Sequence, residues 1–253
     1  MIPAERSEGM DWTKAKSILI VALIVTNLVL IATYVLQNKG FNEDDQEMQD
    51  VTIKLLEEKN IFVKTDIPKE HPRMAKLTVQ YDKMDEELIN SQIKEQKGLS
   101  ESKQTDESLV SMTDDFLKSC GLLTENTIFD EIERTDDGIL IYYKNYIDGI
   151  AIEDSHITVA VKSGKITDVR RFWLNPVEIG SIEKEVIPAA AALIKFMSEN
   201  TTGERIYVNG ISLVYWLDSG SFDAESPVTD TAFPAWKITY NKDKIKYIPA
   251  WEQ

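Results

Sequence analysis

The segment HITVAVKSGKITDVRRFW, residues 156–173, is the clearest local signal of secondary structure in the chain. Apolar and polar side chains alternate on both sides of Ser163-Gly164. Such alternation, with a period of two residues, is typical of a strand that buries one face. A two-residue connection containing glycine suits a tight hairpin, because glycine accepts the positive φ angles of such turns. The segment therefore predicts two antiparallel strands joined at Ser163-Gly164.

The elements that precede this hairpin form the first part of an expected repeat. A helix is predicted around Leu109–Leu117, and Gly121 is a suitable residue to end it. The segment ILIYYKNYIDGIAI, residues 139–152, is rich in β-branched and aromatic residues and is expected to bend at Asp148-Gly149. A helix followed by antiparallel strands is therefore the expected order.

The same order is expected again towards the C-terminus. Residues 183–200 are rich in alanine and predict a helix, with Pro188 near its first turn, where proline is tolerated. A strand or strand pair is predicted at residues 205–218, and a final hairpin at residues 232–253. Helix and antiparallel meander, twice over, predict an α+β fold in which each sheet packs one face on its helix.

A third group of elements is expected nearer the N-terminus, where the periodicity is weaker. Residues 94–108 contain few apolar side chains, which favours a boundary between two units there. The expected elements before that boundary are a helix at 48–60, strands at 61–68 and 75–83, and a helix at 85–96.

The segment SILIVALIVTNLVLIATYVL, residues 17–36, has no charged residue. Twenty helical residues extend about 30 Å, which matches the hydrocarbon thickness of a bilayer. The apolar core of a signal peptide is shorter, and no convincing small-x-small cleavage site follows the segment. A buried core helix is the alternative, but such a helix is seldom apolar on every face. We therefore predict an uncleaved transmembrane helix.

The charges around the span predict its orientation. Lys14 and Lys16 lie just before it, and basic residues near a span favour the cytoplasmic side. The expected organisation is a cytoplasmic N-terminus (1–16), the span (17–36), and two extracellular α+β units (37–104 and 105–253). The charges of the first 36 residues cancel, so the net charge of −15 belongs to the outer region. Such a region repels phosphate backbones, which excludes nucleic acid as the expected partner.

Motifs that would indicate catalysis or metal binding are missing from the sequence. Two histidines, His71 and His156, have no third ligand at metal-binding spacing. The S-x-x-K pattern at Ser100–Lys103 lies in a polar segment that would not hold a nucleophile in a dry site. Cys120 is the only cysteine and closes an apolar helix, which favours a buried side chain over a reactive thiol. We expect no enzyme activity, cofactor or metal.

Asn27 is an unusual residue for the middle of a membrane span. An amide on the lipid side is costly, whereas small residues and hydrogen bonds promote contact between transmembrane helices. We predict that this face docks another transmembrane helix; the alternative is that Asn27 bonds locally. Helical spacing places Asn27 at the edge of a stripe formed by Leu19, Ala22, Thr26, Val29 and Thr33.

The segment from Met10 to Leu36 resembles the start of the YycI-type regulatory proteins of Gram-positive bacteria. These begin with an Asp-Trp-(Ser/Thr)-Lys-x-Lys run, followed by one apolar span that contains an asparagine. The closing segment FPAWKITYNKDKIKYI, residues 233–248, is also similar to the end of the family. Met10 matches the family's start, so residues 1–9 would be either an extension or the product of a misplaced start codon. The matching N-terminal residues are Asp11, Trp12, Thr13, Lys14, Lys16 and Asn27.

The resemblance implies a non-catalytic, single-pass membrane protein with an α+β outer region. It implies partners as well: a sister protein of YycH type and the WalK (YycG) sensor histidine kinase, which controls cell-wall metabolism through WalR. Contact through transmembrane helices would give Asn27 a role. Two other hypotheses stay open at this point: an exported, anchored protein that binds a wall-derived or peptide ligand, and a tethered wall enzyme, which the missing motifs disfavour.

Overall fold

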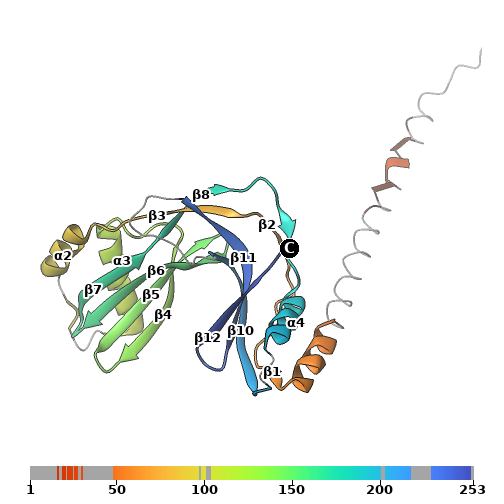
Figure 1. Ribbon diagram of the computed structural model, residues 1–253. Coiled ribbons are helices and arrows are strands. Elements are labelled where there is room, and N and C mark those ends of the chain that lie inside the picture. Colours follow the sequence, from red (N-terminus) through yellow and green to blue (C-terminus); the bar gives the residue numbers. More distant parts are fainter. Residues whose placement is uncertain are drawn as a thin grey trace, which may run out of the picture. The chain divides into compact units, whose positions relative to one another are not determined.

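The computed structural model describes residues 16, 19–20, 22–24, 26–27, 30, 48–96, 98–100, 104–200, 203–217 and 229–251. The chain divides into two compact units, residues 1–51 and 52–253. Within the described residues, the second unit holds a ten-stranded sheet and a separate pair of short strands. Most strand pairs are antiparallel, and few helices accompany them (Figure 1). The predicted α+β class is confirmed for this unit.

Helix α3 (Asp106–Ser119) opens the first meander, as the sequence predicted. Gly121 follows it with a φ of 69°, and the Leu122 N–H donates to the Leu117 carbonyl at 2.8 Å, which ends the helix. The predicted hairpin turn at Ser163-Gly164 is confirmed, and the predicted bend at Asp148-Gly149 is a second hairpin turn; all four residues have positive φ angles. The strands are β4 (Thr127–Thr135), β5 (Gly138–Ile147), β6 (Ile150–Lys162) and β7 (Lys165–Phe172).

Helix α4 opens the second meander, but it is shorter than predicted. Residues 183–188 are not helical, because Pro188 takes an extended ψ of 148° and forms the N-cap. Lys184–Glu185 instead forms β9, which pairs with β2 (Arg73–Met74). The predicted strand at 205–218 and the final hairpin are confirmed. The elements are α4 (Ala189–Glu199), β10 (Ile206–Trp216), β11 (Thr229–Tyr240) and β12 (Lys244–Pro249).

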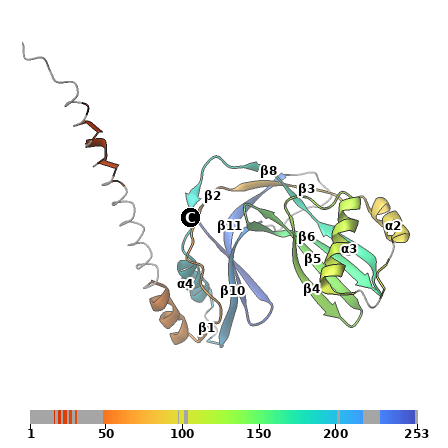
Figure 2. The ribbon, with the colours of Figure 1, turned by 180° about the vertical axis from the view of Figure 1, so that it is seen from behind.

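The two meanders join along β6, which pairs with different strands at its two ends. Ala151 and Ile152 pair in parallel with Val214 and Tyr215 of β10, whereas residues 156–162 pair with β7. The meanders lie side by side, the first with α3 and the second with α4 (Figure 2). The parallel pair was not predicted, since sequence periodicity does not show which distant strands meet.

Residues before position 104 add elements to both meanders. The predicted helix at the start is confirmed at residues 48–58, and β1 (Ile61–Val63) pairs in parallel with β10. The strand β3 (Leu77–Tyr81) lies between β11 and β8 (Leu174–Ile179). The helix α2 (Glu86–Glu95), also predicted, packs with the first meander.

Two hydrophobic cores follow from this arrangement. One gathers around α4 and includes Leu56 and Trp236, while the other lies under α2 and α3 and includes Ile89 and Trp173. Each core takes residues from both sides of position 104. The division into units 37–104 and 105–253 stays a prediction.

Within the described part of the chain, no helix is both long enough and apolar enough to cross a membrane. Most of the predicted span, residues 17–36, lies outside the described residues. The expected transmembrane helix therefore stays a prediction.

Candidate functional site

The predicted docking face of the span is described at four of its six positions. Leu19, Ala22, Thr26 and Asn27 are helical and exposed, and the Thr26 hydroxyl donates to the Ala22 carbonyl at 2.9 Å. The other two positions, Val29 and Thr33, lie outside the described residues. A partner for this face stays a prediction.

The residues that sequence reasoning considered for chemistry lie apart in ordinary surroundings. Cys120 is buried in the core beneath α3, as predicted, and burial raises the pKa of its thiol. His71 Nδ1 lies 3.1 Å from a carboxylate oxygen of Glu185, and His156 stacks on Phe172. Among the described residues, no group of three or more His, Cys, Asp or Glu side chains is placed to hold a metal ion.

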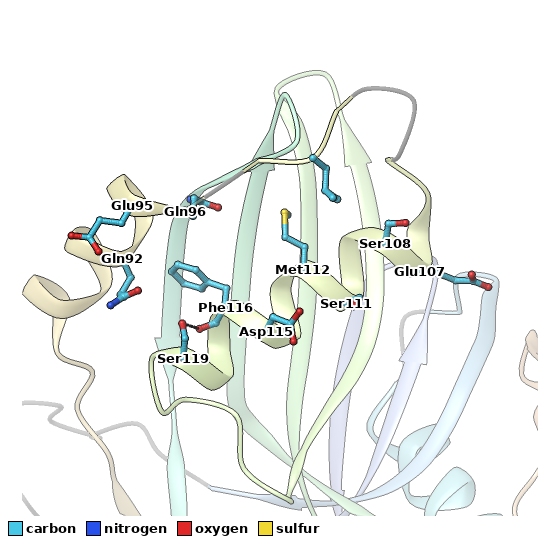
Figure 3. Close-up of a pocket in the computed structure, with 11 residues that line it drawn as sticks. Gln92, Glu95, Gln96, Glu107, Ser108, Ser111, Met112, Asp115, Phe116 and Ser119 are labelled. Carbon is cyan, nitrogen blue, oxygen red and sulfur yellow. Dashed lines mark hydrogen bonds between the residues drawn. The ribbon is translucent and has the colours of Figure 1, made fainter.

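A hollow of the second unit lies between α2 and α3. It is about 760 Å³ in volume, and we call it the α2–α3 groove. Met112 and Phe116 project from the same side of α3 into this region (Figure 3). Together with Leu99 they form the apolar part of the lining. The other lining residues are Gln92, Glu95, Gln96, Glu107, Ser108, Ser111, Asp115 and Ser119.

Gln96 fixes the α2 side of the groove to the sheet. Its Nε2 donates to the Ile166 carbonyl at 2.6 Å, and its Oε1 accepts from the Ile166 N–H at 3.0 Å. Three residues after Gln96, the Leu99 N–H donates to the Gly164 carbonyl at 2.8 Å. A Cβ atom on Gly164 would lie only 2.2 Å from the Leu99 oxygen, so glycine is needed at this close approach. The segment after α2 is therefore held against the β6–β7 turn.

The α3 side of the groove is fixed by buried polar contacts. Tyr143 on β5 is almost fully buried, and its hydroxyl lies 2.6 Å from the Thr113 hydroxyl. The same hydroxyl donates to the Asp114 carboxylate at 2.7 Å. Burial raises the pKa of Tyr143, and the Asp114 charge raises it further. Tyr143 is thus a neutral donor that positions α3 on the sheet.

Among the residues that the structure describes, the charged side chains that line the α2–α3 groove are all acidic. They are Glu95, Glu107 and Asp115, which are exposed, and no described lysine or arginine lines the groove. None of the three carboxylates has an ion-pair partner among the residues that the structure describes. An apolar strip with unpaired carboxylates beside it suits a ligand that is both apolar and cationic. Sequence reasoning missed this site, because its residues belong to two helices whose meeting the sequence does not show.

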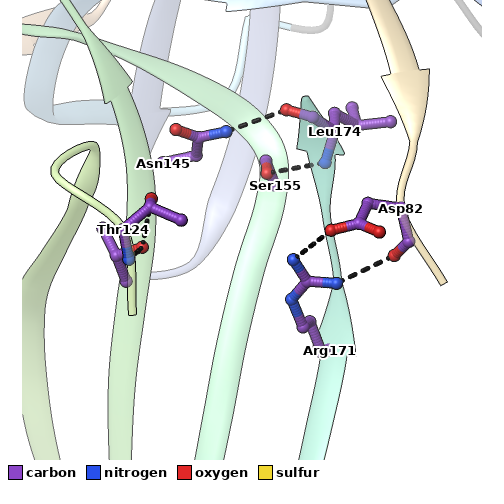
Figure 4. A network of polar contacts seen from close by, with 7 residues as sticks. Asp82, Thr124, Asn145, Ser155, Arg171 and Leu174 are labelled. Atoms are coloured by element: carbon purple, nitrogen blue, oxygen red, sulfur yellow. Dashed lines mark hydrogen bonds and ion pairs between the residues drawn. The ribbon is translucent and has the colours of Figure 1, made fainter. Parts of the chain in front are cut away.

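A second polar site lies where β6 crosses from one meander to the other. Three residues of β6, Glu153 to Ser155, have no opposite residue on β5 and form a bulge. Ser155 accepts from the Leu174 N–H at 3.0 Å, and Asn145 donates to the Leu174 carbonyl at 2.8 Å (Figure 4). All of these contacts are buried, so the bulge is a defined part of the fold.

The bulge turns Glu153 towards the second meander. Its carboxylate pairs with Lys237 on β11 and accepts from the Tyr247 hydroxyl on β12 at 3.2 Å. Both members of the ion pair are largely buried. Burial, with the Glu153 charge, raises the pKa of Tyr247. This cluster joins the two meanders and contains no nucleophile with an adjacent base.

The described residues thus define an α+β protein with a groove between two of its helices. The comparison with protein families identifies it further: the family model described as "YycI protein" matches residues 41–251, and the chain belongs to the YycI family. No curated protein matches the chain. The family is regulatory and non-catalytic, and its role lies in the WalK two-component system.

Proposed function

We propose that the chain is a single-pass membrane protein that binds a WalK-type sensor histidine kinase, together with a YycH-type sister protein, and modulates kinase activity. The family match across residues 41–251 carries this proposal. The proposed topology places residues 1–16 in the cytoplasm and the α+β region outside the cell. Lys14 and Lys16, just before the span, support this orientation.

Regulation of this kind requires a difference in affinity between kinase states. A partner that binds the active and inactive conformations equally well does not shift the equilibrium between them, however tightly it binds. We propose that the span supplies part of the contact, with Asn27 hydrogen-bonding to a neighbouring transmembrane helix. Interhelical hydrogen bonds in membranes average about 0.6 kcal/mol, so Asn27 would act with the small residues Ala22 and Thr26 rather than alone.

Co-purification from mild detergent tests the proposal. The full-length chain would be expressed with the candidate kinase and sister protein as wild type, as Asn27→Leu, and with an unrelated apolar span. Capture by the wild type and weaker capture by both variants is the expected result. Failure of the wild type to capture either protein would refute the regulatory complex.

The second candidate function is an anchored binding protein, and the α2–α3 groove favours it. In that case the span is only an anchor, and an unrelated span replaces it without loss. If the wild type, Asn27→Leu and the chimera with an unrelated span all capture the kinase and the sister protein equally, recognition belongs to the outer region.

A further inference from the structure

We propose that the α2–α3 groove binds a short, basic, amphipathic helical segment of a partner protein. This goes beyond the proposed function, because it assigns a site on the outer region and holds whether or not the kinase supplies the segment.

The shape of the groove suits a helix. It lies between two helices, α2 of 10 residues and α3 of 14 residues, which extend about 15 Å and 21 Å. Recognition of a helix in a groove uses apolar anchors spaced along one face of the ligand. Leu99 and Met112 are half-buried and offer an apolar surface to such anchors, above the buried ring of Phe116. An occupant of about three turns would match the length of α3.

The charges around the groove determine the chemistry of the occupant. Glu95 comes from α2, whereas Glu107 and Asp115 come from α3, so negative charge faces the groove from both helices. A ligand with lysine or arginine beside its apolar face would pair with these carboxylates. Acidic segments and anionic lipid surfaces would be repelled. The polar lining residues Gln92 and Ser111 are compatible with the rim of such an interface.

The groove is also held in place before any ligand arrives. The Gln96 contacts fix the end of α2, and the Tyr143 contacts fix α3. A preformed site binds with little loss of conformational entropy.

Binding of model peptides to the full-length chain tests the proposal. The chain would be placed in nanodiscs of zwitterionic lipid, with empty nanodiscs as the reference. The probe is a fluorescent Leu/Lys amphipathic 12-residue peptide, compared with its Leu/Glu counterpart and with a scrambled Leu/Lys peptide that has no apolar face. Saturable binding of the amphipathic Leu/Lys peptide alone, weakened by salt, is expected.

Matched variants locate the site. Glu95→Gln, Glu107→Gln and Asp115→Asn together should weaken binding about tenfold, because each exposed ion pair contributes about 0.2–1 kcal/mol. The control is Glu57→Gln, Glu58→Gln and Glu204→Gln, which removes the same charge from exposed positions outside the groove and should change binding less than about twofold. Equal weakening by both triple variants, or saturable binding of the Leu/Glu peptide, would overturn the proposal.

A second measurement does not depend on charge. Met112→Cys would carry a bimane label, which a tryptophan in the bound peptide quenches. Cys120 is buried and its thiol pKa is raised, so the label should react at position 112. Quenching that saturates with a Leu/Lys peptide carrying one tryptophan in place of a leucine, without the fluorescent label, is expected. Saturable binding without quenching would place the peptide elsewhere and refute the site.

Discussion

Arg171 and Asp82 join the two halves of the folded unit through a forked contact. Arg171 Nη2 lies 2.7 Å from the Asp82 carboxylate, and Nη1 lies 2.9 Å from the Asp82 main-chain oxygen (Figure 4). The Arg171 side chain is only 3% exposed. The guanidinium also lies over the Trp173 ring, 5.2 Å from its centre. The end of β3 is thereby held against β7, next to the core beneath α2 and α3.

Asp82→Asn should reduce the free energy of unfolding by about 1–2 kcal/mol, because a nearly buried guanidinium loses its counter-charge. Urea denaturation measures this change. The control is Asp168→Asn, which breaks an exposed pair with Arg170 at 2.9 Å and should cost less than about 0.5 kcal/mol. Equal effects of the two variants would show that burial of Arg171 does not matter.

Ser155→Ala should reduce the free energy of unfolding by about 1–3 kcal/mol, because the buried Leu174 N–H would lose its acceptor. The control is Ser198→Ala, which removes an exposed hydroxyl from α4 and should change stability by less than about 0.5 kcal/mol. A neutral Ser155→Ala would mean that the β6 bulge does not depend on this bond.

Lys237→Met should destabilise the chain by about 3–5 kcal/mol, because the carboxylate of Glu153 would stay buried without its cation. Adding Glu153→Gln should restore part of the loss, since the unpaired charge is then gone. A double-mutant cycle on the free energies of unfolding measures the coupling. The exposed pair Lys246 and Glu199 provides the reference cycle, with a coupling below about 1 kcal/mol. Similar coupling in both cycles would contradict a buried bridge.

Tyr143 should make stability fall at alkaline pH. Burial raises its pKa in the folded state above the ordinary value of about 10, so the unfolded state releases the proton first. This contribution is complete below about pH 10 and is lost as the pH rises towards the folded-state value. Tyr143→Phe should be less stable at pH 8, through lost hydrogen bonds, and its deficit should shrink above pH 10.

Urea denaturation between pH 8 and 11 measures the Tyr143 effect. Tyr207→Phe is the control. Tyr207 is 38% exposed, so this substitution should not change how stability depends on pH. A constant difference between wild type and Tyr143→Phe at every pH would contradict the prediction.

The local elements of this fold were predictable from particular residues. Asp148-Gly149 and Ser163-Gly164 marked the hairpins, because glycine accepts the positive φ angles that two-residue turns need. The sequence predicts Pro188 as an early helical residue, but it caps the helix, since its ψ of 148° is extended. Lys184 and Glu185, just before it, form β9, which pairs with the distant strand β2. Local periodicity cannot show such a pairing.

Contacts between distant segments account for what the sequence did not reveal. The parallel pairing of β1 and β6 with β10 depends on tertiary packing rather than on any local pattern. The α2–α3 groove could not be predicted for the same reason, because its acidic residues are separated in sequence. The partners of Glu153 are likewise distant in sequence and could not be predicted. The span face, predicted from helical spacing, stays a prediction together with its contacts.

The proposed effect of this chain on a sensor kinase is measured most directly through autophosphorylation of the kinase. Autophosphorylation of the WalK-type kinase would be followed in nanodiscs with the sister protein, with and without the full-length chain at saturating ratio. The account predicts a change in the initial rate, upward or downward, that Asn27→Leu reduces. An initial rate unaffected by the wild-type chain, in nanodiscs shown to contain it, would contradict the account.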